Sequence, residues 1–188
     1  MTIPVERLLS LVGRFEVNSN SYLLSYPHLL NYFATPDQLT WENLVVGIHS
    51  VYGWMPRVLS INDQHKREVV LIANQVKRSS EFITCEQITI LKGCINNSIV
   101  GVSKLLHFIN PQCYAIWDSR IYRFLHDRKS YYQTNSVENY RSYLVGMRDA
   151  VNDSRSEAIR SRVSGTIDYS VSSMRAIELV MINSVRNG

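Results

Sequence analysis

The sequence lacks the residue patterns that mark several large classes of protein. It has three cysteines and no Cys-x-x-Cys pair, which excludes a zinc ribbon and a four-cysteine iron–sulfur cluster. Its eight glycines and five prolines in 188 residues exclude collagen-like and low-complexity chains. No uncharged apolar stretch approaches the roughly 18 residues that a membrane-spanning helix needs. We therefore expect Cys85, Cys94 and Cys113 to be reduced, mostly buried thiols in a cytoplasmic protein without a membrane partner.

The fingerprints of several common enzymes are missing as well. The chain has no glycine-rich phosphate loop and no dinucleotide-binding motif, so nucleotide hydrolysis and redox chemistry are not expected. It has no Asp-x-Asp pattern or paired-carboxylate cluster that would support metal-assisted cleavage of a phosphodiester. We therefore expect neither a metal nor another cofactor.

The composition supports one globular domain over residues 1–188. Hydrophobic residues make up 45% of the chain and charged residues 19%, a balance that permits a core. The net charge of +4 lies wholly in residues 120–188, where 11 basic side chains, ten of them arginines, stand against 7 acidic ones. The planar guanidinium suits phosphate, so this part of the chain suggests a polyanionic partner, although ordinary solvated helix faces explain the same composition.

The spacing of apolar residues predicts an all-α protein, a helical bundle, and leaves open a division into two lobes with a cleft between them. Apolar side chains from Val5 to Phe15 recur every three or four residues. Thr35 has the pattern of a helix cap and Gly53 that of a helix end. Residues 96–98, with the sequence Asn-Asn-Ser, predict a tight turn between two apolar helices. The expected helices cover about 4–17, 21–33, 35–53, a stretch from Asn62 or Asp63 to Ser80, two helices within 86–108, one after Asp118, and 136–150, 154–164 and 170–184, with a polar loop at 129–136.

The segment from Val100 to Leu125 combines a lysine and an aspartate in a pattern that suggests chemistry. Lys104 lies early in an apolar helix, and Asp118 precedes the next helix as its N-cap. A carboxylate at a helix N-terminus stays ionised and can stabilise a developing oxocarbenium ion. A partly desolvated lysine amine can attack the C1 atom of a sugar. Asp118 as a cap alone, and Lys104 as a solvent-facing lysine, are the alternatives.

This segment resembles the signature of the helix-hairpin-helix DNA glycosylases. Residues 101–104, Gly-Val-Ser-Lys, resemble the end of the hairpin, and residues 117–123, Trp-Asp-Ser-Arg-Ile-Tyr-Arg, resemble the helix of the catalytic aspartate. The resemblance covers residues 86–126 and implies two helical lobes around a DNA-binding cleft, with base flipping. The single hairpin glycine, the short interval from lysine to aspartate and the missing cysteine loop point to outlying members, similar to archaeal 8-oxoguanine glycosylases or antiviral glycosylases of phage DNA.

The resemblance assigns roles to particular residues. Asp118 is expected to stabilise the transition state and Lys104 to be the nucleophile, with Lys92 as the other candidate amine. For single aromatic residues and for the histidine, packing in the core is the competing explanation. The residues expected near a flipped base are Tyr52, Trp54, His107, Tyr114, Trp117 and the turn residues Asn96 and Asn97, and those expected near phosphates are Gly101, Ser103, Arg120, Arg123, Arg155, Arg160 and Arg162.

The resulting expectation is a monomeric DNA glycosylase that acts on double-stranded DNA and leaves an abasic site. The sequence leaves open which base is removed, and a modified cytosine of phage DNA, hence antiviral defence, is one option. It also leaves open whether the enzyme goes on to cleave the strand. The alternatives are a non-catalytic helical DNA-binding or regulatory protein, which needs no Lys104–Asp118 pair, and a helical toxin or nuclease, which has no metal cluster to support it.

Overall fold

The computed structural model describes residues 1–17, 21–53, 59–126 and 132–186. Over these residues the backbone forms helices and a single isolated bridge between Ile61 and Ile95, which confirms the predicted all-α class. The helices are α1 (Val5–Val12), α2 (Ser21–Ala34), α3 (Trp41–Tyr52), α4 (Lys66–Arg78), α5 (Cys85–Cys94), α6 (Ile99–Ile109), α7 (Ser119–His126), the 3₁₀-helix η1 (Tyr132–Asn135), α8 (Val137–Asn152), α9 (Ser156–Ile167) and α10 (Ser173–Arg186).

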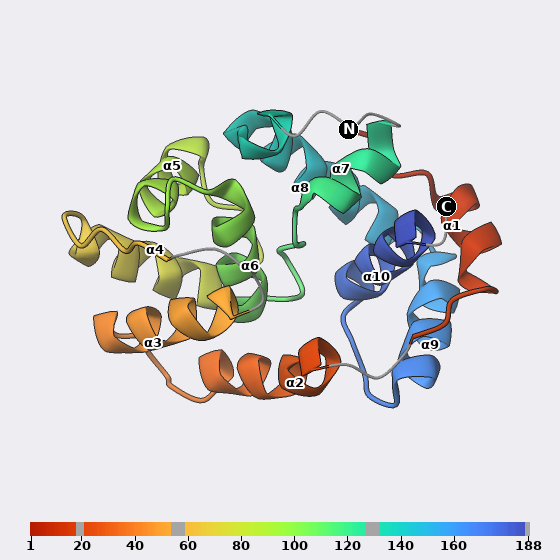
Figure 1. Ribbon diagram of the computed structural model, residues 1–188, viewed down its shortest axis with the longest axis horizontal. Helices are drawn as coiled ribbons and strands as arrows, with labels where there is room; N and C mark the ends of the chain where they lie inside the picture. The colour runs from red at the N-terminus through yellow and green to blue at the C-terminus, as the bar shows by residue number, and fades with distance from the viewer. Residues whose placement is uncertain (18–20, 54–58, 127–131, 187–188) are drawn as a thin grey trace.

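The helices pack in two groups that lie side by side in Figure 1. In one group α2, α3, α4 and α5 surround α6, and in the other α1, α7 and α9 pack against α10. Helix α8 contacts α5 and α6 on one side and α9 and α10 on the other, so it joins the two groups. The first and last helices are in contact, which brings distant parts of the chain together.

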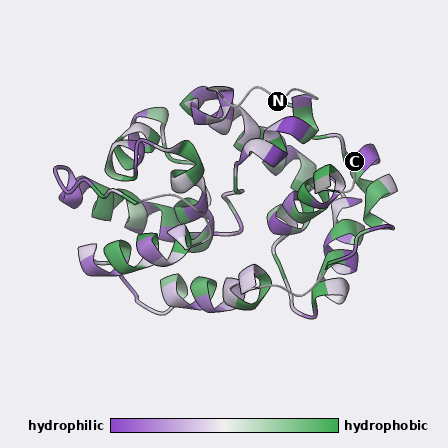
Figure 2. Cartoon of the chain, viewed as in Figure 1, coloured by the Kyte–Doolittle hydropathy of each residue, from purple (hydrophilic) through white to green (hydrophobic). Residues whose placement is uncertain are grey.

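Helix α6 lies at the centre of its group. All of its residues except Val100 are buried, including the polar Ser103, Lys104 and His107. Most other helices are amphipathic, and Figure 2 shows their mixed hydrophobic and hydrophilic colouring. A fully buried helix must satisfy its polar side chains inside the protein, so the neighbours of these three residues define the candidate site. No helix among the described residues is both long and apolar enough to cross a membrane.

The predicted start of the third helix is wrong. The Thr35 hydroxyl does not cap α3 but donates to the Asn31 carbonyl at 2.8 Å, at the end of α2. Lys77 donates to the last carbonyls of α2, those of Phe33 and Ala34, and so satisfies acceptors that a helix end leaves open. The sequence Thr-Pro-Asp follows the end of α2. Because the same pattern is typical of a helix start, the prediction placed the start of the third helix there.

Helix α3 begins at Trp41. Its N-cap is Thr40, five residues after Thr35, and it forms a capping box. Thr40 accepts from the Asn43 amide at 3.3 Å, and the Asn43 side chain accepts from the Thr40 amide at 3.0 Å. Reciprocal bonds of this kind satisfy two backbone donors at the helix start. Apolar spacing located the body of the helix, but the prediction placed the cap at Thr35, and the bonds with Asn43 show that the cap is Thr40.

Thr40→Ala is expected to lower the free energy of unfolding by about 1 kcal/mol, because it removes the capping acceptor of α3. The matched control is Thr35→Ala, which removes only a hydroxyl that bonds back to a carbonyl one turn earlier, and we expect a loss below about 0.5 kcal/mol. Urea unfolding followed by circular dichroism measures both. Equal losses for the two variants would contradict the assignment of Thr40 as the cap.

Other predicted helix boundaries also differ from those in the structure. Helix α1 ends at Val12, and Phe15 is buried beyond its end. Helix α4 begins at Lys66, after Asn62 and Asp63, and no side chain caps it. The described part of the expected loop at 129–136 contains η1. The remaining helices lie close to their predicted ranges, and Ser98, Asp118 and Ser136 cap α6, α7 and α8.

The cysteines are free, but only one is buried. Cys94 is buried at the end of α5, Cys113 is half-buried and Cys85 is exposed. The expectation of mostly buried thiols is therefore wrong for Cys85, which starts α5 on its solvent-facing side.

Candidate functional site

The turn between α5 and α6 is held by two neighbouring segments. Asn96 and Asn97 have φ values of 51° and 50°, the left-handed region that asparagine tolerates. The Asn96 amide donates to the Ser60 carbonyl at 3.1 Å, and the Ser60 amide donates to the Asn96 side chain. Asn135 accepts from the Ile99 amide at 2.9 Å and donates to the Asn97 carbonyl at 3.1 Å. The predicted turn is confirmed, but the amides of Asn96 and Ile99 are already bonded within the protein, and Asn97 is exposed at its tip.

Gly101 and Ser103 lie inside α6 and serve packing. A Cβ atom on Gly101 would lie 2.6 Å from the Tyr52 hydroxyl and 3.0 Å from Ile95, so the close approach of these side chains explains the glycine. Ser103 is fully buried and bonds to both backbone groups of Trp117, accepting from its amide at 3.0 Å and donating to its carbonyl at 3.2 Å. Both residues were expected near phosphates, and the structure instead places them in the core.

The non-helical segment at residues 114–118 is held by side chains instead of by a sheet. Residues 114–117 are buried, so their backbone groups need partners within the protein. These come from α6, α8 and α10 and hold the segment at nearly every residue. The bonds run from His107 to the Tyr114 carbonyl at 2.7 Å, from Tyr140 to the Ala115 carbonyl at 3.2 Å, from the Ile116 amide to Glu178, and between Ser103 and Trp117 as above.

Two aromatic residues expected to stack on a base are part of the core. Trp117 is fully buried, its ring lies 4.8 Å from that of Tyr143, and its Nε1 donates to the Thr134 carbonyl at 3.0 Å. Tyr114 is also fully buried and accepts from the Ile83 amide at 2.9 Å. Neither ring is accessible in this conformation. Trp54 lies outside the described residues, and Tyr52 is buried against Gly101.

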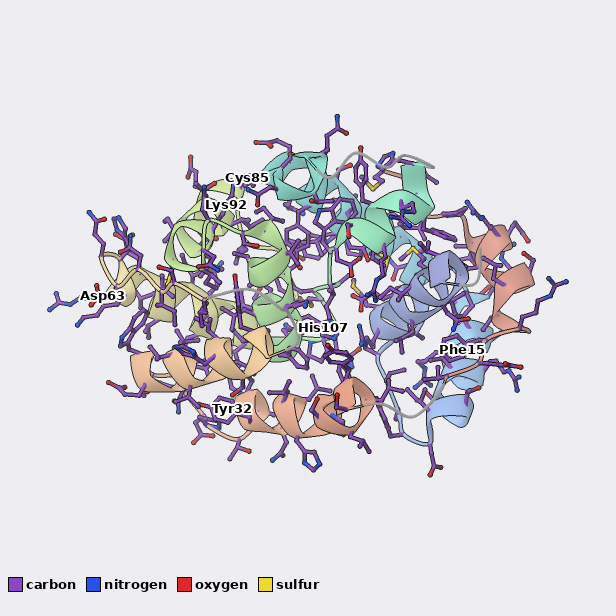
Figure 3. All side chains as sticks on the ribbon, in the orientation of Figure 1. Phe15, Tyr32, Asp63, Cys85, Lys92 and His107 are labelled. Carbon is purple, nitrogen blue, oxygen red and sulfur yellow. The ribbon has the colours of Figure 1, made fainter. Side chains whose placement is uncertain are left out.

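His107 is a satisfied core histidine. It lies near the middle of the molecule in Figure 3 and is fully buried. A carbonyl only accepts, so Nδ1 carries the proton that is donated to Tyr114, and Nε2 accepts from the Tyr26 hydroxyl at 2.8 Å. Burial, reinforced by the Arg175 charge, lowers the pKa of His107 to about 3. The ring therefore stays neutral and holds the segment in place.

Asp118 is the N-cap of α7, as predicted. Its Oδ1 accepts from the amides of Arg120 and Ile121, each at 2.9 Å. The side chain is half-buried at the end of segment 114–118. One carboxylate oxygen is thus tied to the helix start, and the carboxylate is held in a defined place.

The Asp118 charge acts on the amine of Lys104, which lies on α6. The residue is only 8% exposed, although it is a lysine. Burial lowers the pKa of Lys104 to about 8; the Asp118 charge opposes this decrease, and the Arg175 and Arg120 charges add to it. Near pH 8 about half of the amines are therefore neutral. Ser103 bonds to Trp117 and so ties α6, which carries Lys104, to the segment that precedes Asp118.

Sequence reasoning missed a buried ion pair on α10. Arg175 donates to Glu178 at 2.9 Å, and these residues are 6% and 0% exposed. Burial raises the pKa of the Glu178 carboxyl, and the Arg175 charge opposes this rise. Tyr143, also fully buried, carries a hydroxyl without a hydrogen-bond partner among the described residues. The signal for the ion pair was present, because two opposite charges three residues apart interrupt an apolar helix.

The arginines expected to face DNA divide into two sets. Arg120 and Arg123 are exposed on α7, close to Asp118 in sequence. Arg155, which precedes α9, pairs with Glu6 and Asp153.

Within α9, Arg160 pairs with Glu157 at 2.7 Å, and Arg162 is exposed. Acidic neighbours therefore compensate two of the three arginines of the predicted basic strip at residues 155–162, and Arg155 precedes α9 instead of lying within it. Lys92, the other candidate amine, donates to the Asn135 carbonyl at 3.2 Å and supports η1 from α5, away from His107 in Figure 3.

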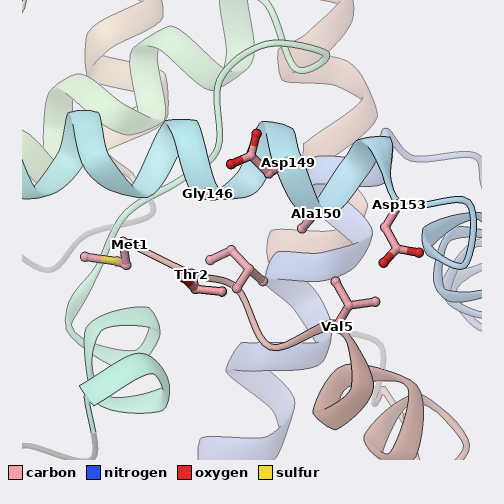
Figure 4. Close-up of a pocket in the computed structure, with 8 residues that line it drawn as sticks. Met1, Thr2, Val5, Gly146, Asp149, Ala150 and Asp153 are labelled. Carbon is pink, nitrogen blue, oxygen red and sulfur yellow. The ribbon is translucent and has the colours of Figure 1, made fainter.

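A pocket between the N-terminal residues and α8 does not belong to this site. It is shown in Figure 4, and Asp149 and Asp153 contribute its charged side chains, an arrangement that would repel a phosphate. The Met1 ammonium donates to Ser142 at 2.7 Å beside it. Gly146 lets the N-terminal backbone approach α8 closely, because a Cβ atom at this position would clash with the Met1 carbonyl.

The fold and this site together define an all-α protein in which the charge of a helix-capping aspartate acts on a buried lysine. No protein-family model matches the chain, and no curated protein or solved structure matches it either. A function is therefore inferred from the chain's own residues.

Proposed function

We propose that the protein is a DNA glycosylase that removes a damaged or modified base and leaves an abasic site. One observation carries this proposal: the amine of Lys104, nearly closed off from water on α6, is close enough to the capping carboxylate of Asp118 for the two charges to interact. A desolvated amine beside a fixed carboxylate suits displacement at a sugar carbon, where positive charge develops.

In the proposed reaction the neutral Lys104 amine attacks C1′ of the nucleotide. The bond between C1′ and the base breaks, and the base leaves with the electron pair and takes up a proton from solvent. The Asp118 carboxylate stabilises the positive charge on the sugar in the transition state. The nitrogen then loses a proton, the sugar ring opens to a Schiff base, and water hydrolyses it to an abasic site and the free amine.

Access to the amine requires movement. Lys104 is 8% exposed, so a flipped nucleotide reaches it only when side chains over α6 are displaced. The exposed Arg120, at the start of α7, and Arg123, in its last turn, are the cations proposed to hold the phosphates next to that nucleotide. Binding through these phosphate contacts is expected to weaken steeply with salt.

The experiment that tests the proposal is base release with borohydride trapping. Plain, uracil-containing, oxidised, alkylated and glucosylated hydroxymethylcytosine DNAs are each incubated with the protein and assayed for abasic sites. We expect release from one of them and a trapped covalent complex. Because only the neutral amine attacks, trapping should rise about tenfold per pH unit below the Lys104 pKa of about 8 and level off above it.

Trapping that is independent of pH, or that survives in Lys104→Met, would contradict the role of Lys104. The matched control is Lys92→Met, which removes the other candidate amine, on the neighbouring helix α5. This control is expected to trap like the unchanged protein.

A non-catalytic helical DNA-binding protein is the second candidate. One observation favours it. The polar groups of Ser103, His107, Tyr114 and Trp117 bond within the protein, so in this conformation they do not contact a base. Salt-sensitive DNA binding with no abasic sites on any substrate would support this candidate over the glycosylase.

A further inference from the structure

Two arginines of α8 lie against one aromatic ring in the loop between α4 and α5. The ring is that of Phe82, which is 8% exposed and precedes the start of α5 at Cys85. The guanidinium carbon of Arg141 lies 4.7 Å from the centre of this ring, and that of Arg148 lies 4.6 Å from it. Helix α8 contacts α5 (Figure 1). The two arginines are two helical turns apart, so they project from the same side of α8.

Phe82 holds the two positive charges near one another. A guanidinium over an aromatic ring is attracted by the ring and is held in a defined place. Since both guanidinium groups lie against the same ring, their charges are no farther apart than the screening length of about 10 Å at about 0.1 M salt. Like charges at this separation repel one another, so the pair favours an anion that contacts both.

Acidic neighbours compensate this pair only in part. Arg148 lies 3.6 Å from the Glu81 carboxylate, but that side chain is 80% exposed, and an exposed ion pair contributes little. Arg141 forms no ion pair with the residues that the structure describes, and its Nη1 is shielded from water without a hydrogen-bond partner among them. Glu138, one turn before Arg141, accepts from the Ser136 hydroxyl at 2.8 Å. Positive charge therefore remains at this place.

The loop that carries Phe82 is tied to the segment that ends at Asp118. The Tyr114 hydroxyl accepts from the Ile83 amide at 2.9 Å and donates to the Glu81 carbonyl at 3.3 Å. The rings of Phe82 and Tyr114 are 5.8 Å apart. Tyr114 and Asp118 are the two ends of the segment, so at most about 14 Å separates their Cα atoms. One short stretch of backbone therefore supports both the arginine pair and the candidate site.

We propose that Arg141 and Arg148 form a second DNA contact, at which they bind phosphates of the backbone. The Phe82 ring is nearly closed off from solvent, so it offers no surface on which a base could stack. Guanidinium groups instead offer N–H donors that fit phosphate oxygens. Such a contact is expected to be independent of base sequence. The inference rests on the proposed function for DNA as the partner.

The test is the salt dependence of DNA binding. Arg141→Gln with Arg148→Gln removes both charges and keeps polar side chains. Binding to an unmodified duplex is measured by fluorescence anisotropy over a series of salt concentrations. We expect the slope of log affinity against log salt to become shallower by about 1 to 2, and the affinity at about 0.1 M salt to fall about tenfold to fiftyfold.

Two further double variants separate charge from other effects. Arg141→Lys with Arg148→Lys keeps both charges, so it should keep the slope. Arg160→Gln with Arg162→Gln is the matched control, because it removes the same charge from α9, where Glu157 already compensates Arg160. A slope in the Arg141 and Arg148 glutamine variant that equals the slope of this control would overturn the proposal.

Stability is checked by circular dichroism. If the double glutamine variant does not fold, Arg148→Gln alone is the decisive variant, because this side chain is 43% exposed and its replacement is expected to leave the fold intact. Its slope should become shallower by about 1, and an unchanged slope would overturn the proposal.

A separate measurement distinguishes DNA from a small phosphate ligand. Nitrogen NMR of labelled arginine side chains is recorded with the duplex and with inorganic phosphate. Arg141 and Arg148 signals that respond to the duplex support the proposal, and signals that respond only to inorganic phosphate would overturn it. The glycosylase is tested independently, because DNA binding through this pair without base release would remove the proposed reaction and leave the contact standing.

Discussion

Asp118→Asn is expected to reduce base release at least about a hundredfold, because it removes the carboxylate charge that stabilises the positively charged sugar. An asparagine side chain retains the oxygen that accepts from the Arg120 and Ile121 amides at 2.9 Å, so the cap of α7 is kept. We expect the melting temperature and the DNA affinity to stay close to those of the unchanged protein. Single-turnover release of the base, measured with enzyme in excess, gives the rate.

The comparison variant is Asp118→Ala, which loses both the charge and the cap. It should match Asp118→Asn in activity but unfold about 1 kcal/mol more easily. The lost charge should also lower the Lys104 pKa in both variants, because Asp118 favours the charged amine. Full base release by Asp118→Asn would show that the residue is only a cap and would remove the basis of the proposed mechanism.

Trp117→Ala is expected to have the largest effect on stability, a loss of about 3–5 kcal/mol in the free energy of unfolding. The side chain is fully buried against Tyr143 and holds the Thr134 carbonyl. Trp117→Phe keeps most of the buried ring and loses the hydrogen bond, so a loss of about 1–2 kcal/mol is expected. Urea unfolding followed by circular dichroism measures both variants.

The matched control for Trp117 is Leu71→Ala on α4, where the leucine is 70% exposed and its removal should change stability by less than about 0.5 kcal/mol. The opposite result for Trp117→Ala, near-native stability with a loss of DNA affinity, would restore the original expectation that the indole stacks on a base.

The turn at residues 96–98 shows which features of the fold the local sequence predicts. Asparagine tolerates the left-handed conformation, and apolar runs on both sides predict two helices, so α5 and α6 were recognised without tertiary information. The cap at Asp118 was recognised for the same reason, because its bonds lie within three residues of the chain. The start of α3 shows the limit of local signals, since Thr35 fits the pattern of a cap but its hydroxyl bonds to the end of α2, and Thr40 caps the helix.

The candidate site was predictable only in part. Lys104 and Asp118 were proposed from their places in the two helices and from the resemblance to the glycosylase signature, and in the structure the Asp118 charge acts on the Lys104 amine. The partners that bring this about, Ser103, Tyr140 and Glu178, lie on three different helices. No pattern within a short window indicates that side chains from three helices bond to the backbone of one segment.

The sequence by itself determined the all-α class, most of the helices and the cap at Asp118, because these depend on the periodicity of apolar residues and on bonds between neighbours in the chain. Only the tertiary structure decided which polar residues are buried. Trp117 and His107 became part of the core, and Arg175 and Glu178 became a buried pair, because burial depends on what distant helices place against a side chain. The protonation of Lys104 follows from that packing, since excluding water makes a charged amine costly.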